Sequence, residues 1–599
     1  MNSEMIGAQT ITPDARSSGE GRGSSTQRHG RGARTDVSGM RVLDLRGTAE
    51  EMGEQHGALL RDDVARGPVP YYRRTVERLL GKPLGRLSGP AARAIQNVVG
   101  SRVARTMPDF ARDTIRGIAR GAGLDEREFM LGCTMPDALM WVTAQLHRVR
   151  DPGPAVAHRL ALGLGCTSAI AWGNATRDGK LYHARNLDYH GVDPWPTTAT
   201  VAFHTPDVGQ RYVAVTAAGV GLGGITAMNE AGLTLTVHQH MFTDRTRLGG
   251  TPIGVVGDLV MREARSLDDA QAILARHKPI GCWTYLVTSG RERAVLCHEE
   301  NPERRVALRT SPNDTTFAYA NIYLDPELGS TEVASYGTYW RHNRGRHARA
   351  NELVRSGAAR GDLDARAMAS ILADAGSDPR CRLRDSIGMV MTVGSVVFRP
   401  EDGALWVGRG PASADEPCAA PTSRGGFVPM SLERGGFDPD KGSFDTRPDG
   451  EASTAADRAF DAYRRAYVAY LDHGDLDATL EALLTACELA PEQPVYHAVA
   501  GIVHVEAGQA GRARELLDRA IALGHPDEER LASFYLWRGR AKDLAGDRSG
   551  ARADYRRCLA MHADAPVHAA AKKGDRVAFD RARAARVHIE MGLGDVVVP

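Results

Sequence analysis

The chain has 599 residues, 25% of them charged, and a formal net charge of +1 from 75 basic and 74 acidic side chains. Because this length exceeds one ordinary core, it predicts two or three domains. The balanced charge provides no global field for nucleic acid or an anionic membrane surface, and no apolar run reaches the length of a membrane span. The eight cysteines lack the paired spacing of a disulfide framework, and the N-terminus lacks the apolar core of a signal peptide. These features predict a cytoplasmic protein with reduced thiols.

The first 165 residues divide into two parts. Residues 1–38 are rich in Gly, Ser, Arg and Thr, so we expect a disordered tail that buries too little apolar surface to fold. Residues 39–165 begin with an alternating strand pattern at 41–45 and continue with helical spacing. Thr48 and Glu51 are typical of a capping box at the start of the first helix.

Short strand patterns with polar turns dominate residues 166–412. Helical stretches at about 253–276 and 340–375 interrupt them. Antiparallel hairpins with a few helices favour a layered α+β domain over a doubly wound sheet. Residues 413–453, rich in Pro, Gly, Asp and Ser, are interpreted as a linker.

The segment 454–590 is helical and repetitive. Gly474 and Gly508 are 34 residues apart, Gly508 and Gly546 are 38 apart, and Ala513 and Ala551 each follow their glycine by five positions. This pattern resembles the tetratricopeptide repeat, in which helix pairs stack at a 34-residue period. It predicts an all-α repeat domain that could dock a protein partner, and an ordinary helical bundle is the alternative.

The densest chemistry surrounds Cys166. Gly165 precedes it, and a hairpin turning at Asp178-Gly179 brings Arg185 and Asp188 back beside it. A buried cysteine on a strand is usually a packing residue, and that alternative stays open. If the Gly165–Cys166 bond were cut, however, Cys166 would carry an α-amine with a pKa of about 7.7–8.0. This amine could accept the proton of its own thiol, Asp188 could hold it, and Arg185 could lower the thiol pKa.

Two quoted segments carry a family resemblance. "GCTSAIAW…DGKLYHARNLDY" and, upstream, "LDLRGTAEEMGEQHG" resemble the acyl-coenzyme A:6-aminopenicillanic acid acyltransferase-like family. Members are N-terminal-nucleophile hydrolases related to choloylglycine hydrolases and acid ceramidase. The resemblance covers roughly residues 40–412 and implies an αββα sandwich that cleaves itself between Gly165 and Cys166. It also implies that Cys166 is the nucleophile and that Arg185 and Asp188 are catalytic.

Further catalytic and binding residues follow from the same resemblance. "AMNEAGLTLTVHQ" places Gln239, and "FAYANIY" places Asn321, as donors to the oxyanion of a tetrahedral intermediate. Each has a purely structural alternative, at a strand end for Asn321 and between two histidines for Gln239. Arg346 is the candidate substrate-binding arginine, in competition with Arg341, Arg344 and Arg349.

Several other patterns are given a structural interpretation. "GVGLGG" at 219–224 lacks the βαβ unit of a nucleotide site, and His238 and His240 lack a third metal ligand. No cofactor and no metal are therefore predicted. The stretch "RHNRGRHAR" is interpreted as a solvated helix face, and contact with an anionic substrate group is the alternative. His183 and His190 are interpreted as solvated histidines. Three further cysteines are interpreted as packing residues, namely Cys282, Cys297 and Cys558.

The main hypothesis is a self-processing thiol enzyme. It would form an acyl thioester on Cys166 from a non-peptide amide or an acyl donor such as an acyl-CoA or a carrier-bound acyl group, and pass the acyl group to water or an amine. Cleavage would leave an α/β heterodimer made from one precursor. One alternative is a tetratricopeptide-type binding module with a degenerate Cys166 domain, and another is an amidase that never cleaves its chain.

Overall fold

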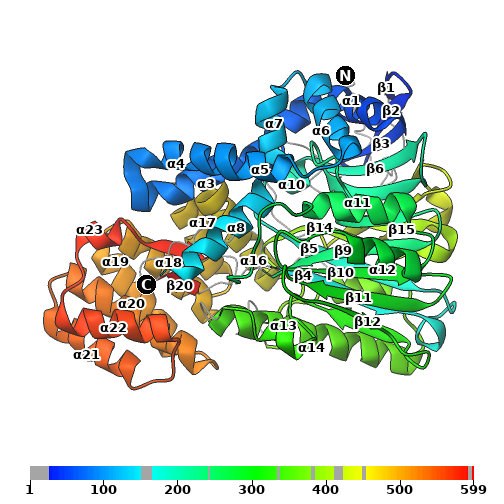
Figure 1. Ribbon diagram of the computed structural model, residues 1–599. Coiled ribbons are helices and arrows are strands. Elements are labelled where there is room, and N and C mark those ends of the chain that lie inside the picture. Colours follow the sequence, from blue (N-terminus) through cyan, green and yellow to red (C-terminus); the bar gives the residue numbers. More distant parts are fainter. Residues whose placement is uncertain are drawn as a thin grey trace, which may run out of the picture.

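The computed structural model describes residues 26–149, 165–240, 243–333, 337–378, 385–409, 422–447, 454–590 and 596–598. Figure 1 shows two parts side by side, a stack of sheets and helices and a smaller, mostly helical part at the C-terminal end. No helix in these ranges is long and apolar enough to cross a membrane.

The first sheet joins strands from both sides of Cys166. Its neighbouring strands pair antiparallel except β3 and β6, which run parallel. The ten strands in sheet order are β1 (Gln27–His29), β2 (Gly32–Val37), β3 (Met40–Gly47), β6 (Ala199–Pro206), β7 (Tyr212–Ala217), β8 (Thr226–Asn229), β9 (Leu233–Gln239), β10 (Trp283–Ser289), β11 (Ala294–Glu300) and β12 (Arg305–Arg309).

The second sheet has β4, the strand of Cys166, near one edge. Its strand order is β13 (Thr316–Tyr319), β4 (Gly165–Ala171), β5 (Tyr182–Asp188), β14 (Thr392–Arg399), β15 (Ala404–Gly408), β16 (Gly426–Ser431) and β17 (Gly436–Phe437), with β18 (Phe444–Asp445) also paired to β16.

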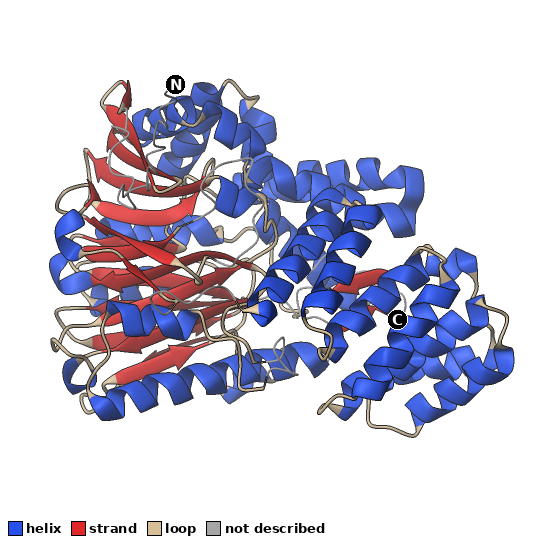
Figure 2. Ribbon diagram, turned by 180° about the vertical axis from the view of Figure 1, so that it is seen from behind, coloured by secondary structure: helices blue, strands red, loops and turns tan. Residues whose placement is uncertain are grey.

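The sheets form the middle of a four-layer stack. Apolar side chains of the first sheet, such as Val201 and Phe203, form one buried cluster with Val396 and Phe398 of the second. Helices α11 (Ile253–Glu263) and α12 (Leu267–Arg276) pack on the outer face of the first sheet. Helices α14 (Gly337–Arg360) and α15 (Ala365–Leu372) cover the second sheet, as Figure 2 shows from behind. The predicted αββα sandwich is thus confirmed.

The helices before Cys166 pack against the sheets and against one another. Thr48 caps the first of them with the predicted capping box to Glu51. These helices are α1 (Ala49–Leu59), α2 (Arg61–Arg66), α3 (Pro68–Leu84), α4 (Ser88–Ala94), α5 (Ser101–Ala104), α6 (Asp109–Ala122), α7 (Glu126–Cys133) and α8 (Met135–Arg148). Two short helices, α10 (Pro194–Thr197) and α13 (Pro326–Gly329), follow later in the chain.

The C-terminal part is all-α apart from a short hairpin, and its consecutive helices pack against each other. Gly501 meets Leu517 and Gly539 meets Tyr555, so small residues allow close helix pairs as the repeat pattern predicts. The tetratricopeptide name itself stays a prediction. The elements are α16 (Ala455–Tyr467), α17 (Leu476–Leu489), α18 (Pro494–Glu506), α19 (Ala510–Leu523), α20 (Glu528–Leu544), α21 (Arg548–Leu559), α22 (Ala565–Arg576), α23 (Arg581–Ala584), β19 (His588–Glu590) and β20 (Val596–Val598).

Two predicted irregular segments are wrong in part. The expected disordered tail 1–38 contains β1 and β2, and the expected linker 413–453 contains β16, β17 and β18. In both cases a neighbouring strand, β3 for β2 and β15 for β16, supplies hydrogen bonds that Gly-rich and Pro-rich composition does not reveal. Residues 1–25, 410–421 and 448–453 lie outside the described residues.

Candidate active site

The Gly165–Cys166 step opens β4, and β5 lies beside it. Gly165 pairs with Asp188, Cys166 with Leu187, and Ser168 with Arg185. Since side chains alternate along a strand, Cys166 and Arg185 lie on one face of the sheet, whereas Thr167 and Asp188 lie on the other. The hairpin predicted from sequence therefore brings both charged residues to the cysteine, from opposite sides of the strand.

Gly165 occupies a tightly packed position. An added Cβ would lie 3.1 Å from Met389 Sδ and 3.3 Å from both Arg346 Nη2 and Asp188 Cβ. A larger residue would push these groups apart, which explains the glycine before Cys166. The fifteen residues that precede it, 150–164, lie outside the described ranges.

The Cys166 thiol is buried next to a guanidinium. Arg185 Nη2 lies 3.3 Å from Cys166 Sγ, and Arg185 Nη1 donates to the Val237 carbonyl at 3.1 Å. Burial raises the pKa of the Cys166 thiol, and the Arg185 charge opposes this shift. The thiol is therefore protonated at neutral pH.

The backbone N–H of Cys166 has a side-chain partner. It donates to Asn321 Oδ1 at 2.6 Å, while Asn321 Nδ2 donates to the Gln239 carbonyl at 2.8 Å. Asn321 adopts a left-handed backbone conformation with a φ of 43°, which is uncommon for a non-glycine residue. The structure thus brings Asn321 to the cysteine as predicted, but in this state its amide accepts from the Cys166 nitrogen.

Asp188 is fully buried behind the junction. Thr392 donates to Asp188 Oδ1 at 2.6 Å, whereas Oδ2 has no hydrogen-bond partner among the described residues. Burial raises the pKa of this carboxyl, and the Arg346 charge and the Thr392 hydroxyl oppose the shift. Asp188 Oδ2 could therefore accept a further hydrogen bond at this end of β4.

Arg346 lies against the junction rather than in a substrate pocket. From α14, its Nη1 donates to the Cys166 carbonyl at 2.9 Å and to Thr167 Oγ1 at 2.8 Å, and its Nη2 donates to Asn321 Oδ1 at 3.2 Å. It is fully buried and absent from the residues that line the pocket beside Cys166. These contacts orient the chain around Cys166, and the predicted substrate-binding role of Arg346 stays a prediction.

The arginines that competed with Arg346 have other partners. Arg341 pairs with Glu529 at 2.6 Å, and Arg349 pairs with Asp374 at 2.9 Å. The stretch "RHNRGRHAR" is thus only partly a solvated face. His183 and His190 are also buried rather than solvated, and the burial of His183 lowers its pKa to about 3, so it is neutral.

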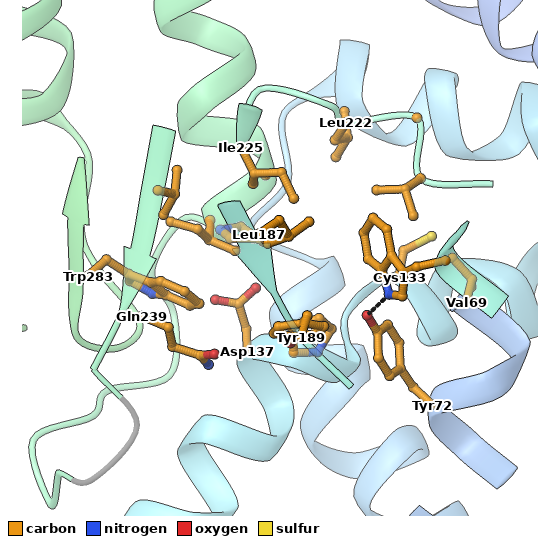
Figure 3. Close-up of a pocket in the computed structure, with 18 of the residues that line it drawn as sticks. Val69, Tyr72, Cys133, Asp137, Leu187, Tyr189, Leu222, Ile225, Gln239 and Trp283 are labelled. Atoms are coloured by element: carbon orange, nitrogen blue, oxygen red, sulfur yellow. Dashed lines mark hydrogen bonds between the residues drawn. The ribbon is translucent and has the colours of Figure 1, made fainter. Parts of the chain in front are cut away.

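A pocket of about 140 Å³ opens beside the thiol. Cys166, Arg185 and Gln239 line it together with mostly apolar side chains, and the part before the junction supplies one wall. Figure 3 shows Gln239 and Trp283 on one side and Tyr72 and Val69 on the other, with the hydrogen bond from Trp195 Nε1 to the Tyr72 hydroxyl dashed (3.1 Å). Gln239 thus faces the space where a substrate carbonyl would meet Cys166, whereas Cys282, Cys297 and Cys558 are buried elsewhere, as predicted.

Residues 175–411 carry a recognisable family pattern. The model of the acyl-coenzyme A:6-aminopenicillanic acid acyl-transferase family matches residues 175–411. The resemblance seen in the sequence is thereby confirmed over this range. The acyl-transferase match begins nine residues after Cys166 and includes Arg185, Asp188, Gln239, Asn321 and Arg346.

The chain is also similar to solved structures, among them one from Caenorhabditis elegans. It is an N-acylethanolamine-hydrolysing acid amidase orthologue, with 16% sequence identity and a TM-score of 0.29 over 39% of this chain and 93% of that one. The search of curated proteins finds no match. The match to the acyl-transferase family supports an N-terminal-nucleophile type of amidohydrolase or acyltransferase.

Three residues around the site escaped the sequence analysis. Asp137 lines the pocket, Thr392 binds Asp188, and Arg464 of α16 donates to the carbonyls of Val390 and Thr392 at 2.8 and 3.1 Å. None stands in a recognisable motif. An acid inside the otherwise apolar run "TMPDALMW" is the one signal that could have drawn attention to Asp137.

Proposed function

We propose that the protein is an N-terminal-nucleophile cysteine amidohydrolase or acyltransferase that cleaves its own chain between Gly165 and Cys166. One observation carries the proposal, the set of side-chain contacts around the single residue Cys166. Asn321 binds the Cys166 nitrogen, Arg346 binds its carbonyl, and Arg185 lies beside its sulfur. A cysteine that merely fills a core needs partners for its backbone groups, which strand pairing usually supplies, but it needs neither buried side chains on both of those groups nor a guanidinium beside its sulfur.

Self-cleavage would proceed by an N→S acyl shift. The Cys166 sulfur attacks the Gly165 carbonyl carbon, the C–S bond forms as the C–N bond breaks, and the thiol proton ends on the Cys166 nitrogen. Water then hydrolyses the thioester and leaves a carboxylate on Gly165 and a free amine on Cys166. Asp188 Oδ2 would accept from this new amine.

In turnover the freed α-amine takes the thiol proton. The thiolate attacks the carbonyl of a linear amide or an acyl thioester, and an acyl-cysteine forms as the amine or thiol leaves. Water or an amine then resolves this intermediate, giving hydrolysis or acyl transfer. Gln239 and Asn321 are proposed as the donors to the oxyanion, each with an effect of about 10²–10³ on the rate.

The decisive test is the mass of the purified protein. Wild type is expected to give chains of 165 and 434 residues, the second starting at Cys166. Cys166→Ala should stay intact and inactive, Cys166→Ser should cleave slowly, and the buried control Cys297→Ala should cleave like wild type. An active wild-type preparation in one intact chain would refute the self-cleavage and favour an amidase that keeps its chain.

The two acyl acceptors can be separated with the same preparation. Incubation with an acyl donor followed by mass spectrometry of the peptide that begins at Cys166 detects the thioester, and addition of hydroxylamine or a simple amine shows whether it is transferred. The cytoplasmic location and a protein partner for residues 454–590 stay predictions.

A further inference from the structure

The pocket beside Cys166 contains an acid that the proposed chemistry does not use. Among the described lining residues, Asp137 is the only carboxylate, and its side chain is almost fully buried, with the residue 2% exposed. Its Oδ1 has no hydrogen-bond partner among the described residues. Figure 3 shows this carboxylate extending into the pocket, between Gln239 and Leu187.

The surroundings of Asp137 stabilise the charged form of its carboxylate only in part. It stands in the first turn of α8, and the backbone N–H of Ile253 at the start of α11 favours its charged form. Burial among apolar side chains has the larger effect and raises the pKa of Asp137 to about 7. A buried polar atom without a partner costs free energy, so its presence in a binding pocket points to a ligand that supplies the missing bond.

The size of the pocket limits what can enter. Its volume of about 140 Å³ is close to that of an engineered apolar cavity of about 150 Å³ that holds benzene. Its walls include flat aromatic side chains, among them Trp283, Tyr189 and Trp195. A phenyl ring or a short branched chain fits this volume, whereas a long fatty chain would have to extend out of the pocket.

The acyl group is the part of the substrate that would occupy this space. It stays bonded to Cys166 Sγ through both chemical steps, whereas the amine must leave and be replaced by water or a second amine. The occupant next to the thiol is therefore the acyl group.

We propose that Asp137 selects a compact, apolar acyl group that carries one hydrogen-bond donor, an amine or a hydroxyl. The carbonyl of this group lies at Cys166, its apolar body fills the aromatic walls, and its donor binds Asp137 Oδ1. The inference rests on the proposed function, because it assumes acylation of Cys166.

The test uses the self-cleaved, full-length protein and a matched panel of p-nitroanilides. The phenylacetyl compound has no hydrogen-bond donor on its acyl group. The compounds compared with it carry an amino or a hydroxyl group on the α carbon or at the para position of the ring. A hexadecanoyl compound represents long acyl chains. We expect kcat/KM for the best donor-bearing compound to exceed that for phenylacetyl at least tenfold, and the hexadecanoyl compound to be the poorest. Comparison of the amino and hydroxyl arms identifies which donor is preferred.

Substitutions separate the role of Asp137 from a general loss of structure. Asp137→Leu should reduce the preference for a donor to about one, and Asp137→Asn should weaken the preference for the amine more than that for the hydroxyl. Asp258→Asn is the control, because Asp258 is another buried acid, bonded to Tyr212 and Gly224 outside the pocket, and should leave the preference unchanged.

The readouts distinguish two kinds of failure. Mass spectrometry of Cys166 with every compound monitors acylation, and the two-chain pattern monitors folding of each variant. If Asp137→Leu is acylated with the same donor preference as wild type, or if the hexadecanoyl compound is preferred, the inference about Asp137 is overturned while the proposed function stands. If no compound acylates Cys166 in wild type, the proposed function itself fails.

Discussion

The Asp188 carboxylate depends on a hydroxyl from another strand. Thr392 Oγ1 donates to Asp188 Oδ1 at 2.6 Å and accepts from the backbone N–H of Met389 at 3.0 Å. Both Thr392 and Asp188 are fully buried. The hydroxyl therefore fixes one carboxylate oxygen and leaves the other for the amino group that cleavage would create.

This contact predicts a difference between two small substitutions. Thr392→Val removes the donor at almost constant volume, and because a hydrogen bond to a charged group contributes about 1.5–3 kcal/mol, the rate of self-cleavage should fall roughly ten- to hundredfold. Thr392→Ser keeps the hydroxyl and should cleave within a few-fold of wild type. The measurement is the half-time for appearance of the two chains. Equal half-times for the two variants would contradict a role for the hydroxyl.

A buried histidine predicts acid sensitivity. His56 Nε2 accepts from the backbone N–H of Gly219 at 3.0 Å, and burial lowers the pKa of His56 to about 4. Between pH 4 and 6.5 the unfolded chain binds this proton and the folded chain does not, so stability is fully present above pH 6.5 and is lost as the pH falls toward 4.

The size of this effect follows from the shift. A difference of about 2.5 pKa units corresponds to roughly 3 kcal/mol, and His56→Gln, which cannot titrate, should lose about that much less free energy of unfolding between pH 7.5 and 4. Urea unfolding of both proteins at the two pH values tests the difference. Parallel losses would show that His56 is not responsible.

At the residue scale, the sequence reveals contacts within one hairpin more readily than contacts between elements. Cys166, Arg185 and Asp188 are predictable together because one turn fixes the register of β4 on β5. Asn321 and Arg346 come from β13's C-terminal end and from α14, so only the family resemblance indicated them. Asp137, Thr392 and Arg464 stand in no motif, and tertiary packing alone brings them to the site.

At the scale of elements, two helices of the upstream part cross with almost no side chain between them. Gly53 and Gly57 of α1 face α6, and Gly117 and Gly121 of α6 face α1. A Cβ on Gly117 would lie 2.4 Å from the Glu50 carbonyl oxygen, which is closer than any real contact. The two backbones can approach this far only because all four positions lack side chains.

This crossing predicts opposite effects of one substitution at two helical sites. Gly117→Ala should destabilise the protein by roughly 1–3 kcal/mol, since the helices must move apart. Gly511→Ala in α19, where an added Cβ meets nothing within 4 Å, should stabilise it by about 0.5–1 kcal/mol. Thermal unfolding of the two variants measures both effects. A stable Gly117→Ala protein would mean that the helices are not packed this closely.

The type of an element could be predicted from the sequence where the hydrophobic periodicity is strong. The boundaries could not be predicted where pairing with a neighbouring strand determines whether a segment forms a strand. The helical stretches at 253–276 and 340–375 correspond to α11, α12, α14 and α15. By contrast β2 and β16 lie in segments whose overall composition favours loops. Their hydrogen bonds to β3 and β15 stabilise them, and composition averaged over a long window does not detect such pairing.

At the scale of the whole molecule, the first C-terminal helices pack against the strands that carry the candidate active site. One buried apolar cluster contains Cys166 and Leu187 together with Phe460 and Tyr463 of α16. The Tyr71 hydroxyl donates to Asp472 at 2.7 Å, which links the upstream helices to the same region. The first helices of the repeat part therefore cover the rear of the site, and an isolated fragment 455–580 would expose this apolar face.

Arg464 gives this packing a measurable consequence. It is fully buried and binds the carbonyl of Thr392, the residue whose hydroxyl fixes Asp188. Arg464→Met should slow self-cleavage and lower kcat at least tenfold, because the segment carrying Thr392 loses its anchor and a buried carbonyl loses its donor. Arg512→Met, at an exposed arginine of α19, should behave like wild type. Unchanged kcat in Arg464→Met would show that the two parts are energetically independent.

If the chain is cleaved before Cys166 as proposed, the parallel pairing of β3 with β6 determines whether the two chains can separate. Strand β3 precedes Cys166 in the chain and β6 follows it. Seven residue pairs join the two strands, from Arg41 with Thr200 to Gly47 with Pro206. Loss of the upstream chain would expose a whole strand edge of β6, which is a template for aggregation. The two chains should therefore not exchange between molecules: after an isotope-labelled and an unlabelled preparation are mixed, native mass spectrometry should show only the parental pairs, and hybrids should form only after denaturation and refolding.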